Sequence, residues 1–185
     1  MYEQFKANAE GAGNTEVRRF GLKSEALAFI EDILTKEDVG DAPGSYAVWA
    51  ESPFLSGTER EALAVKYHGL TFQVTRELSK GARVGITRMD WGIADTGTLV
   101  QDSTAAEQRL ASALPLIHIA LLGTGNIVPD LPSVMTKVHP DKSAYIALIT
   151  GPSKTADIER VLAIGVHGPE RLYIACVDEL EGTSL

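Results

Sequence analysis

A carboxylate, two hydroxyls and a glycine follow one another in the segment Asp95-Thr96-Gly97-Thr98, directly after an apolar run. Open α/β sheets bind ligands at the carboxyl ends of their strands, so this position suits a small anion. Asp95 is the candidate catalytic residue, as a general base or metal ligand. Backbone amides and hydroxyls of the next three residues can hold a carboxylate or phosphate. The alternative is an ordinary β-turn with Asp first and Gly third.

A second hydroxyl-rich segment covers residues 151–155, between an apolar run and a predicted helix over 155–165. Free amides and hydroxyls at a helix start favour an anion, and Lys154 adds positive charge. Asp157 and Glu159 would repel a phosphate, and the P-loop spacing is absent. One interpretation is a helix that is merely well capped. The other is one wall of a mixed polar pocket, lined by Gly151, Ser153, Lys154, Thr155 and Asp157.

Histidines and flanking polar residues add further candidates. His167 and Gly168 precede the last predicted strand, where an imidazole can bind a ligand, transfer protons or cap a carbonyl. His118 falls inside an apolar run and is expected to be a core histidine with its hydrogen bonds satisfied. No two histidines have metal-ligand spacing, so we expect no metal site. Four other polar residues flank the Asp95 segment and are candidates for the same pocket: Arg88, Asp90, Ser103 and Arg109.

Bulk composition limits the classes of protein and partner. The 185 residues predict one domain over 1–185, and a net charge of −8 argues against nucleic acid or an anionic membrane as partner. Cys176 is the only cysteine, which excludes a disulfide framework and a self-contained iron–sulfur cluster. The opening residues do not resemble a signal peptide, and no apolar stretch reaches the roughly 18–20 residues of a membrane span. We therefore expect a cytoplasmic protein.

Hydrophobic periodicity switches repeatedly between strand and helix patterns. Strands are predicted over 15–20, 45–50, 70–75, 91–94, 97–101, 116–122, 144–150 and 171–177, and the stretch 82–90 is irregular. Helices are predicted over 24–38 (capped by Ser24), 58–69 (capped by Thr58), 104–115 (a Thr104/Glu107 capping box), 130–142 and 155–165. This alternation predicts an α/β fold with a mostly parallel sheet and helices on both faces.

Four segments together resemble a known family: "WGIADTGTLV" (91–100), "RLASALPLIHIALL" (109–122), "YIALITGPSKTADIE" (145–159) and "GVHGP" (165–169). Their order and spacing resemble the LUD-domain family, in its lactate-utilisation protein C (LutC/YkgG) branch. The resemblance covers nearly the whole chain. It implies a fold like that of ribose-5-phosphate isomerase, glucosamine-6-phosphate deaminase and the CoA transferases (NagB/RpiA/CoA-transferase-like), similar to the folate cyclo-ligases.

The same resemblance implies a role in a three-component system that oxidises L-lactate to pyruvate. The iron–sulfur clusters are then expected on the partner proteins, with no cofactor in this chain. The family usually has Glu at the position of Asp95, so the shorter carboxylate here weakens a strict role as nucleophile or ligand. This chain also starts without the longer helical lead of many members, so docking to partners is expected to differ.

Two other functions compete with this one. The chain can be a stand-alone transferase, isomerase or cyclo-ligase that acts on a phosphorylated or carboxylated metabolite, as the hydroxyl clusters and Asp95 suggest. It can also be a non-catalytic regulatory subunit with a vestigial pocket. The segments around 95–98, 151–157 and 167–169 are expected to converge on one site at the strand ends.

Overall fold

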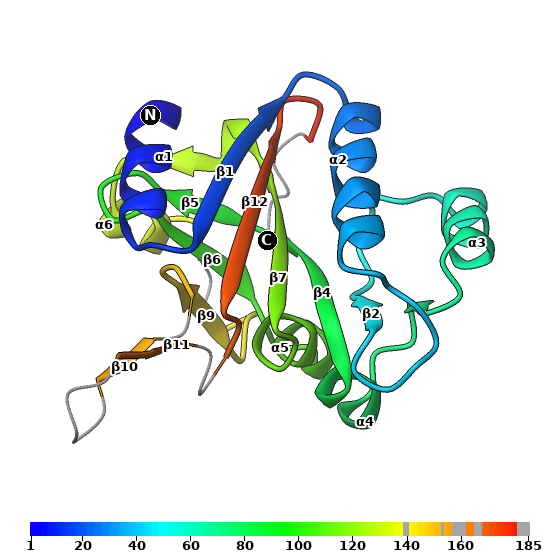
Figure 1. The fold of residues 1–185 in the computed structure, drawn as a ribbon. Coiled ribbons are helices and arrows are strands. Elements are labelled where there is room, and N and C mark those ends of the chain that lie inside the picture. The colour runs from blue at the N-terminus through cyan, green and yellow to red at the C-terminus, as the bar shows by residue number, and fades with distance from the viewer. Residues whose placement is uncertain (139–140, 153, 157–161, 165–167, 181–185) are drawn as a thin grey trace.

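The computed structural model of the protein describes residues 1–138, 141–152, 154–156, 162–164 and 168–180, with backbone alone for 154–156 and 162–164 (Figure 1). Its helices are α1 (Tyr2–Gly11), α2 (Lys23–Lys36), α3 (Gly57–Lys66), α4 (Arg76–Lys80), α5 (Ala106–Ala113), the 3-10 turn η1 (Thr124–Asn126) and α6 (Leu131–Met135). Its strands are β1 (Thr15–Phe20), β2 (Tyr46–Trp49), β3 (Leu70–Thr71), β4 (Ala82–Met89), β5 (Trp91–Ile93), β6 (Thr98–Asp102), β7 (Ile117–Gly123), β8 (Ile127–Val128), β9 (Ile146–Ile149), β10 (Lys154–Ala156), β11 (Leu162–Ile164) and β12 (Arg171–Val177).

A six-stranded sheet in the order β1-β12-β7-β4-β2-β3 forms the centre of the molecule. Every neighbouring pair in it is parallel. All seven residues of β7 are buried, as expected for an interior strand covered on both faces. The predicted parallel sheet is therefore confirmed.

Helices cover both faces of this sheet, which confirms the second part of the fold prediction. On one face, α2 and α3 pack on a core that includes Ile30, Trp49 and Ile119. On the other face, α1 packs through Phe5 on a core that includes Leu122 and the buried thiol of Cys176. Also on the second face, α5 packs through Ala111 near β2. Burial raises the pKa of the Cys176 thiol to about 12, so the thiol stays protonated and unreactive.

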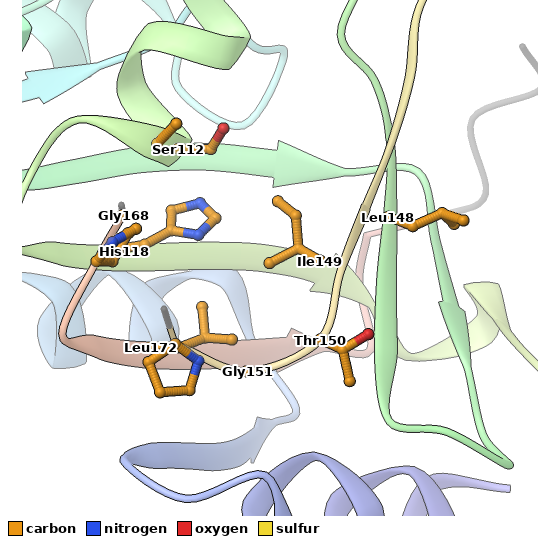
Figure 2. Close-up of a pocket in the computed structure, with 11 residues that line it drawn as sticks. Ser112, His118, Leu148, Ile149, Thr150, Gly151, Gly168 and Leu172 are labelled. Carbon is orange, nitrogen blue, oxygen red and sulfur yellow. The ribbon is translucent and has the colours of Figure 1, made fainter. Parts of the chain in front are cut away.

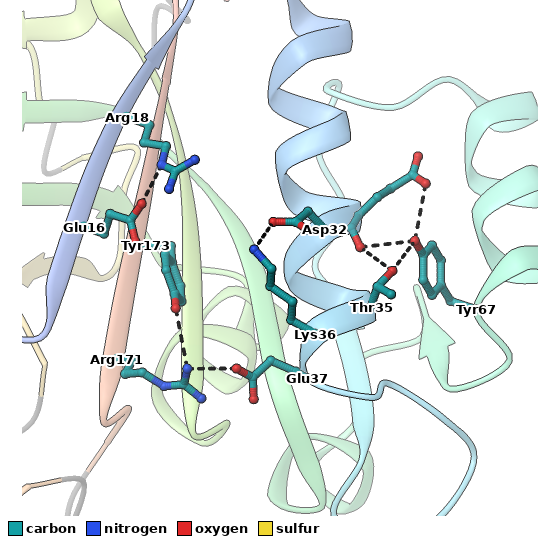
Figure 3. Close-up of polar contacts among 10 residues, drawn as sticks. Glu16, Arg18, Asp32, Thr35, Lys36, Glu37, Tyr67, Arg171 and Tyr173 are labelled. Atoms are coloured by element: carbon teal, nitrogen blue, oxygen red, sulfur yellow. Dashed lines mark hydrogen bonds and ion pairs between the residues drawn. The ribbon is translucent and has the colours of Figure 1, made fainter.

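Polar contacts fix the position of α2 (Figure 3). Glu37, just after the helix, accepts a hydrogen bond from Arg171 Nη1 at 2.8 Å, which ties it to β12. It also accepts one from Arg83 Nε at 2.7 Å, which ties it to β4. In the last turn, the hydroxyl of Thr35 lies 3.2 Å from the Tyr67 hydroxyl, at the end of α3. These contacts tie the carboxyl end of α2 to β12, to β4 and to the end of α3.

A smaller sheet, in the order β8-β5-β6-β9, packs on the same face of the molecule as α1. β5 follows β4 directly and turns back antiparallel into β6, and β6 pairs antiparallel with β9. β9 lies within the strand predicted over 144–150, but it is an edge strand in which Leu148 is 52% exposed. Its run of apolar residues resembles a buried strand because the apolar side chains border the pocket described below.

The prediction of a helix over 155–165 is wrong for its described residues. Residues 154–156 and 162–164 form the antiparallel pair β10 and β11. A short apolar run fits a strand as well as a helix, so periodicity alone cannot decide between them. Of the predicted helix-start residues, Thr155 is therefore in a strand.

Other helix boundaries differ from the predictions because other groups provide the caps. The Thr104 hydroxyl instead accepts hydrogen bonds from the amides of Ala144 and Tyr145, at the entry to β9, and α5 begins without a side-chain cap. Ser56, not Thr58, caps α3. Ser24 lies inside α2, and α6 is one short helix capped by Asp130.

Four further elements were mispredicted. α1 and α4 were not expected at all, and the stretch 82–89 is the long strand β4 rather than an irregular segment. β3 has two residues, not six, because the chain turns after Thr71 into α4. Among the described helices, none combines the length and the apolar character that crossing a bilayer demands.

Acid is expected to weaken the α2–α3 connection through Glu59. Its carboxylate accepts from Lys23 Nζ at 2.7 Å and from the Ser56 amide at 2.7 Å, and these bonds lower its pKa from 4.5 to about 2. The stabilisation is complete above the unfolded-state pKa of 4.5 and is lost as the pH falls through the folded-state value. Because the side chain is 35% exposed, we expect a loss of about 1 kcal/mol.

Urea denaturation at about pH 5 and about pH 3 measures this loss. Glu59→Gln is expected to remove that part of the pH dependence, and Glu61→Gln, at an exposed position on the same helix, serves as the control. An unchanged pH dependence in Glu59→Gln would contradict the assignment.

Candidate functional site

A pocket of about 290 Å³ lies where the small sheet meets the amino ends of β7 and β12 (Figure 2). It is bounded by two loops of the family-like segments, Gly151-Pro152 after β9 and Gly168-Pro169 before β12. The other lining residues are Ser112, Ala113, His118, Leu148, Ile149, Thr150 and Leu172. We call this cavity the His118 pocket. Its size is at the lower end of the range for small-molecule sites, which suits a small metabolite.

His118 is the second residue of β7 and lines the pocket with its imidazole, beside Ser112 of α5 (Figure 2). The residue is 1% exposed. Nε2 lies 2.8 Å from the hydroxyl of Thr87 on β4, whereas Nδ1 is buried and has no hydrogen-bond partner among the described residues. Burial lowers the pKa of His118 to about 4, so the ring is neutral at pH 7. The predicted core histidine is therefore buried, but only one of its two nitrogens is satisfied.

Two hydroxyls accompany the imidazole. Ser112 Oγ donates to the carbonyl of Arg109 at 3.3 Å, one turn earlier in α5. Thr150 Oγ1 lies 2.7 Å from Thr98 Oγ1, which connects the pocket to the first predicted site segment. The pocket therefore offers uncharged hydrogen-bonding groups beside apolar walls.

Gly85 allows α5 to approach the sheet beside the pocket. It lies next to His118 in register on β4. A Cβ at this position would lie 1.9 Å from the carbonyl oxygen of Ala111 and 2.7 Å from Pro115. Only a residue without a side chain lets the end of α5 pack this closely, and this packing positions Ser112 at the pocket.

The predicted Asp95 segment forms the turn between β5 and β6. Asp95 and Thr96 are exposed, and Thr98 is buried. The Asn8 side chain of α1 donates to the carbonyls of Ala94 and Asp95, at 2.8 and 2.9 Å. Asp95 is not among the residues that line the His118 pocket. β5 belongs to the small sheet, where it pairs antiparallel with β6 and parallel with the two-residue β8. The turn is therefore not at the carboxyl edge of the parallel central sheet.

Two glycines with positive φ hold the predicted segments against α1. Gly97 has φ of +66°, and a Cβ there would lie 2.2 Å from the amide nitrogen of Ala9. Gly151 has φ of +68°, and its Cβ would lie 2.6 Å from the Cβ of Ala12. Both positions require glycine on grounds of backbone conformation and of space. The segments around 97 and 151 therefore meet on α1, a helix that was absent from the sequence prediction.

The remaining predicted residues divide as follows. Gly168 lines the His118 pocket together with Gly151. Lys154 and Thr155 are described only as backbone of β10. Ser153, Asp157 and His167 lie outside the described residues. Sequence reasoning missed Ser112, Thr150 and Leu172 as lining residues. It assigned His118 to the core and not to a site. The signal that could have found His118 was a single polar residue inside an apolar strand.

A second cavity, of about 150 Å³, lies at the carboxyl ends of β2 and β4. It is lined by Arg88 and Asp90, two of the flanking residues named from the sequence, together with Glu51, Ser52, Pro53, Gln101, Asp102 and Gln108. Burial raises the pKa of Asp90, opposed by the hydrogen bond from the Asp102 amide. Within the described part of the chain, no three His, Cys, Asp or Glu residues are grouped so as to hold a metal ion.

Comparison with known proteins agrees with this architecture. The pattern that defines the LUD domain matches residues 2–177. The chain is 32% identical to the protein YkgG of Escherichia coli over 177 residues, which is 91% of this chain and 77% of the relative. It is 35% identical to lactate utilization protein C of Halalkalibacterium halodurans over 109 residues, 56% of this chain and 47% of the relative. The chain thus spans about half the length of such relatives.

A solved structure shows the same fold. The crystal structure of a DUF162 family protein from Deinococcus radiodurans superposes with a TM-score of 0.61 over 95% of each chain, at 16% identity. The match to the LUD domain covers α1, both sheets and the loops around the His118 pocket. The protein described here therefore belongs to the LUD domain family.

Proposed function

We propose that the chain is a component of an L-lactate utilisation system. The support is its membership of the LUD domain family and its similarity to proteins named lactate utilization protein C. The observation that carries a binding role is the His118 pocket, because its two bounding loops belong to the segments 145–159 and 165–169 that resemble the family. The chain spans about half the length of those relatives. We therefore propose, as an extension from them, that this shorter chain has the same role.

Within that system we propose a non-redox role beside iron–sulfur partner proteins, in the oxidation of L-lactate to pyruvate. Iron–sulfur clusters are held by several cysteine thiolates. This sequence has a single cysteine, Cys176, and it is buried in the core. Electron transfer through such clusters would therefore take place on other chains. We propose that the whole system works in the cytoplasm.

The proposed ligand of the His118 pocket is a small carboxylate. The pocket volume suits a molecule of this size, and hydroxyls of Ser112 and Thr150 can hydrogen-bond to its oxygens. A phosphorylated metabolite is less well supported, because no described lining residue carries a positive charge. Asp95 lies exposed at its turn, which supports contact with a partner protein or an approaching ligand more than proton transfer within the pocket.

Filling the pocket tests this proposal. Ala113 lines the pocket at the exposed end of α5, so tryptophan there is expected to occupy the ligand volume with little effect on folding. In a strain that lacks the native gene, the wild-type chain is expected to restore growth on L-lactate, and Ala113→Trp to restore it about tenfold less well. Growth rates on L-lactate and on pyruvate are the measurement.

Ala62→Trp is the matched control, because Ala62 is exposed on α3, away from the pocket. It should behave as wild type. Normal growth on L-lactate without the gene would contradict a role in lactate utilisation. Full complementation by Ala113→Trp would contradict the pocket as its binding site.

The second cavity supports one alternative function, a stand-alone enzyme. It lies at the carboxyl ends of β2 and β4, the usual ligand position in open α/β sheets, and it contains a buried carboxyl group, Asp90. Thermal-shift measurements with sugar phosphates, folates and CoA thioesters would test it. Stabilisation that Asp90→Asn abolishes would favour the enzyme, and no stabilisation by any of these compounds would count against it.

A further inference from the structure

The buried imidazole of His118 lines the pocket, and only one of its two ring nitrogens makes a hydrogen bond to a described residue. Thr87 engages Nε2 at 2.8 Å, and within the described part of the chain Nδ1 has no hydrogen-bond partner although the residue is 1% exposed. A buried polar atom without a partner carries an uncompensated desolvation penalty. A ligand in the pocket that hydrogen-bonds to Nδ1 would recover this energy.

The charged side chains that the structure describes around His118 have other partners. Its register neighbours on β4 and β12 are Gly85 and Leu172, which carry no charge. Arg109, one turn before Ser112 in α5, donates to the Ser103 and Thr104 carbonyls and lies 5.0 Å from the ring of Tyr145. Arg171, at the start of β12, is paired with Glu37. His167 lies outside the described residues.

A carboxylate that enters this pocket therefore meets a neutral imidazole as the nearest group able to become positive. We propose that His118 takes up a proton when a small carboxylate binds, and that the imidazolium formed then donates from Nδ1 to the bound carboxylate. The proton comes from solvent and no covalent bond changes. This inference rests on the proposed function for the identity of the ligand, and it adds the charge that the site otherwise lacks.

The energetics give this coupling a definite sign. In the free protein, burial keeps the pKa of His118 at about 4. A carboxylate within hydrogen-bond distance favours the charged imidazole and raises that pKa. Between the free and bound pKa values, each unit decrease in pH is expected to strengthen carboxylate binding by up to about tenfold. An uncharged ligand of the same shape should show no such dependence.

L-lactate and L-lactamide are suitable probes, because they are close in size and differ in charge. Isothermal titration calorimetry in buffers of different ionisation enthalpy measures the protons taken up on binding. We expect about half a proton or more per L-lactate bound at about pH 6, and binding at least about threefold tighter than at about pH 8. L-lactamide should bind without proton uptake.

NMR of the histidine side chains assigns the proton. One imidazole should move to its imidazolium position when L-lactate is added to the wild-type protein, and this signal should be missing in His118→Gln. The wild-type measurements stand on their own if His118→Gln does not fold. L-lactate binding without proton uptake, or with uptake that persists in folded His118→Gln, would overturn the inference.

The absence of binding by both L-lactate and pyruvate would also overturn it. The proposed function is judged separately, by growth on L-lactate. If the chain is needed for growth on L-lactate but binds lactate with no proton uptake, the inference is refuted and the proposed function stands. A dispensable chain that takes up the proton refutes the lactate role and leaves the coupled carboxylate site.

Discussion

Replacing Phe5 by alanine is expected to lower the free energy of unfolding by about 4 kcal/mol, within the usual range for a deeply buried phenylalanine. Phe5 is fully buried and is the main side chain that α1 contributes to the core beneath the small sheet. For a domain of this size, such a loss corresponds to a melting temperature lower by about 10 °C. Thermal unfolding followed by circular dichroism would measure it.

The same substitution should disturb the site, because α1 supports both predicted segments. Asn8 holds the Asp95 turn, and Gly97 and Gly151 pack on the end of this helix. Tyr2→Ala, at a partly exposed position of α1, is the control and should cost about 1 kcal/mol or less. Equal melting temperatures for the two variants would show that α1 is not a structural support.

Gly85→Ala is expected to destabilise the protein by about 3 kcal/mol, at the upper end for overpacking. The added Cβ would lie 1.9 Å from a backbone oxygen of α5, so the helix rather than a flexible side chain has to move. Because α5 carries Ser112 and Ala113, this shift should also weaken ligand binding in the His118 pocket. Urea unfolding and calorimetric titration on the same sample separate the two effects.

Gly11→Ala provides the comparison for this prediction. Nothing lies within 4 Å of a Cβ at Gly11, the last residue of α1, so alanine there should be neutral or slightly stabilising. If Gly85→Ala were as stable as Gly11→Ala, the close approach of α5 to β4 would be refuted.

Much of the sheet could be predicted from the sequence, because strand signals are local. The strands 15–20 and 171–177 have the predicted bounds, since each apolar or alternating run is enclosed by turn residues. Helix α1 was missed because only two of its side chains, Phe5 and Ala9, are fully buried, with Tyr2 partly buried beside them, and most of its other residues are polar. The pair β10 and β11 was mistaken for a helix because the few apolar residues within 155–165 fit a helical repeat as well as a strand repeat.

The site was harder to predict, because it depends on which ends of distant elements meet. The segments around Gly151 and Gly168 were expected near each other, and both line one pocket. They lie at the amino ends of β7 and β12, however, because β9 belongs to a second sheet that reaches the first from that side. His118 was assigned to the core from its apolar neighbours, and sequence alone cannot show that Nδ1 lacks a partner.

The strand order also constrains how the chain can fold during synthesis. β1 has one neighbour in the sheet, β12, which is separated from it by about 150 residues of chain and lies between β1 and β7. Until β12 has left the ribosome, the central sheet is split at that position, and β1 has no strand to pair with. Closing such a distant contact is entropically costly and slow. The nascent chain therefore exposes an unpaired strand and an open sheet edge for most of its synthesis, the stage at which chaperone binding would protect it most.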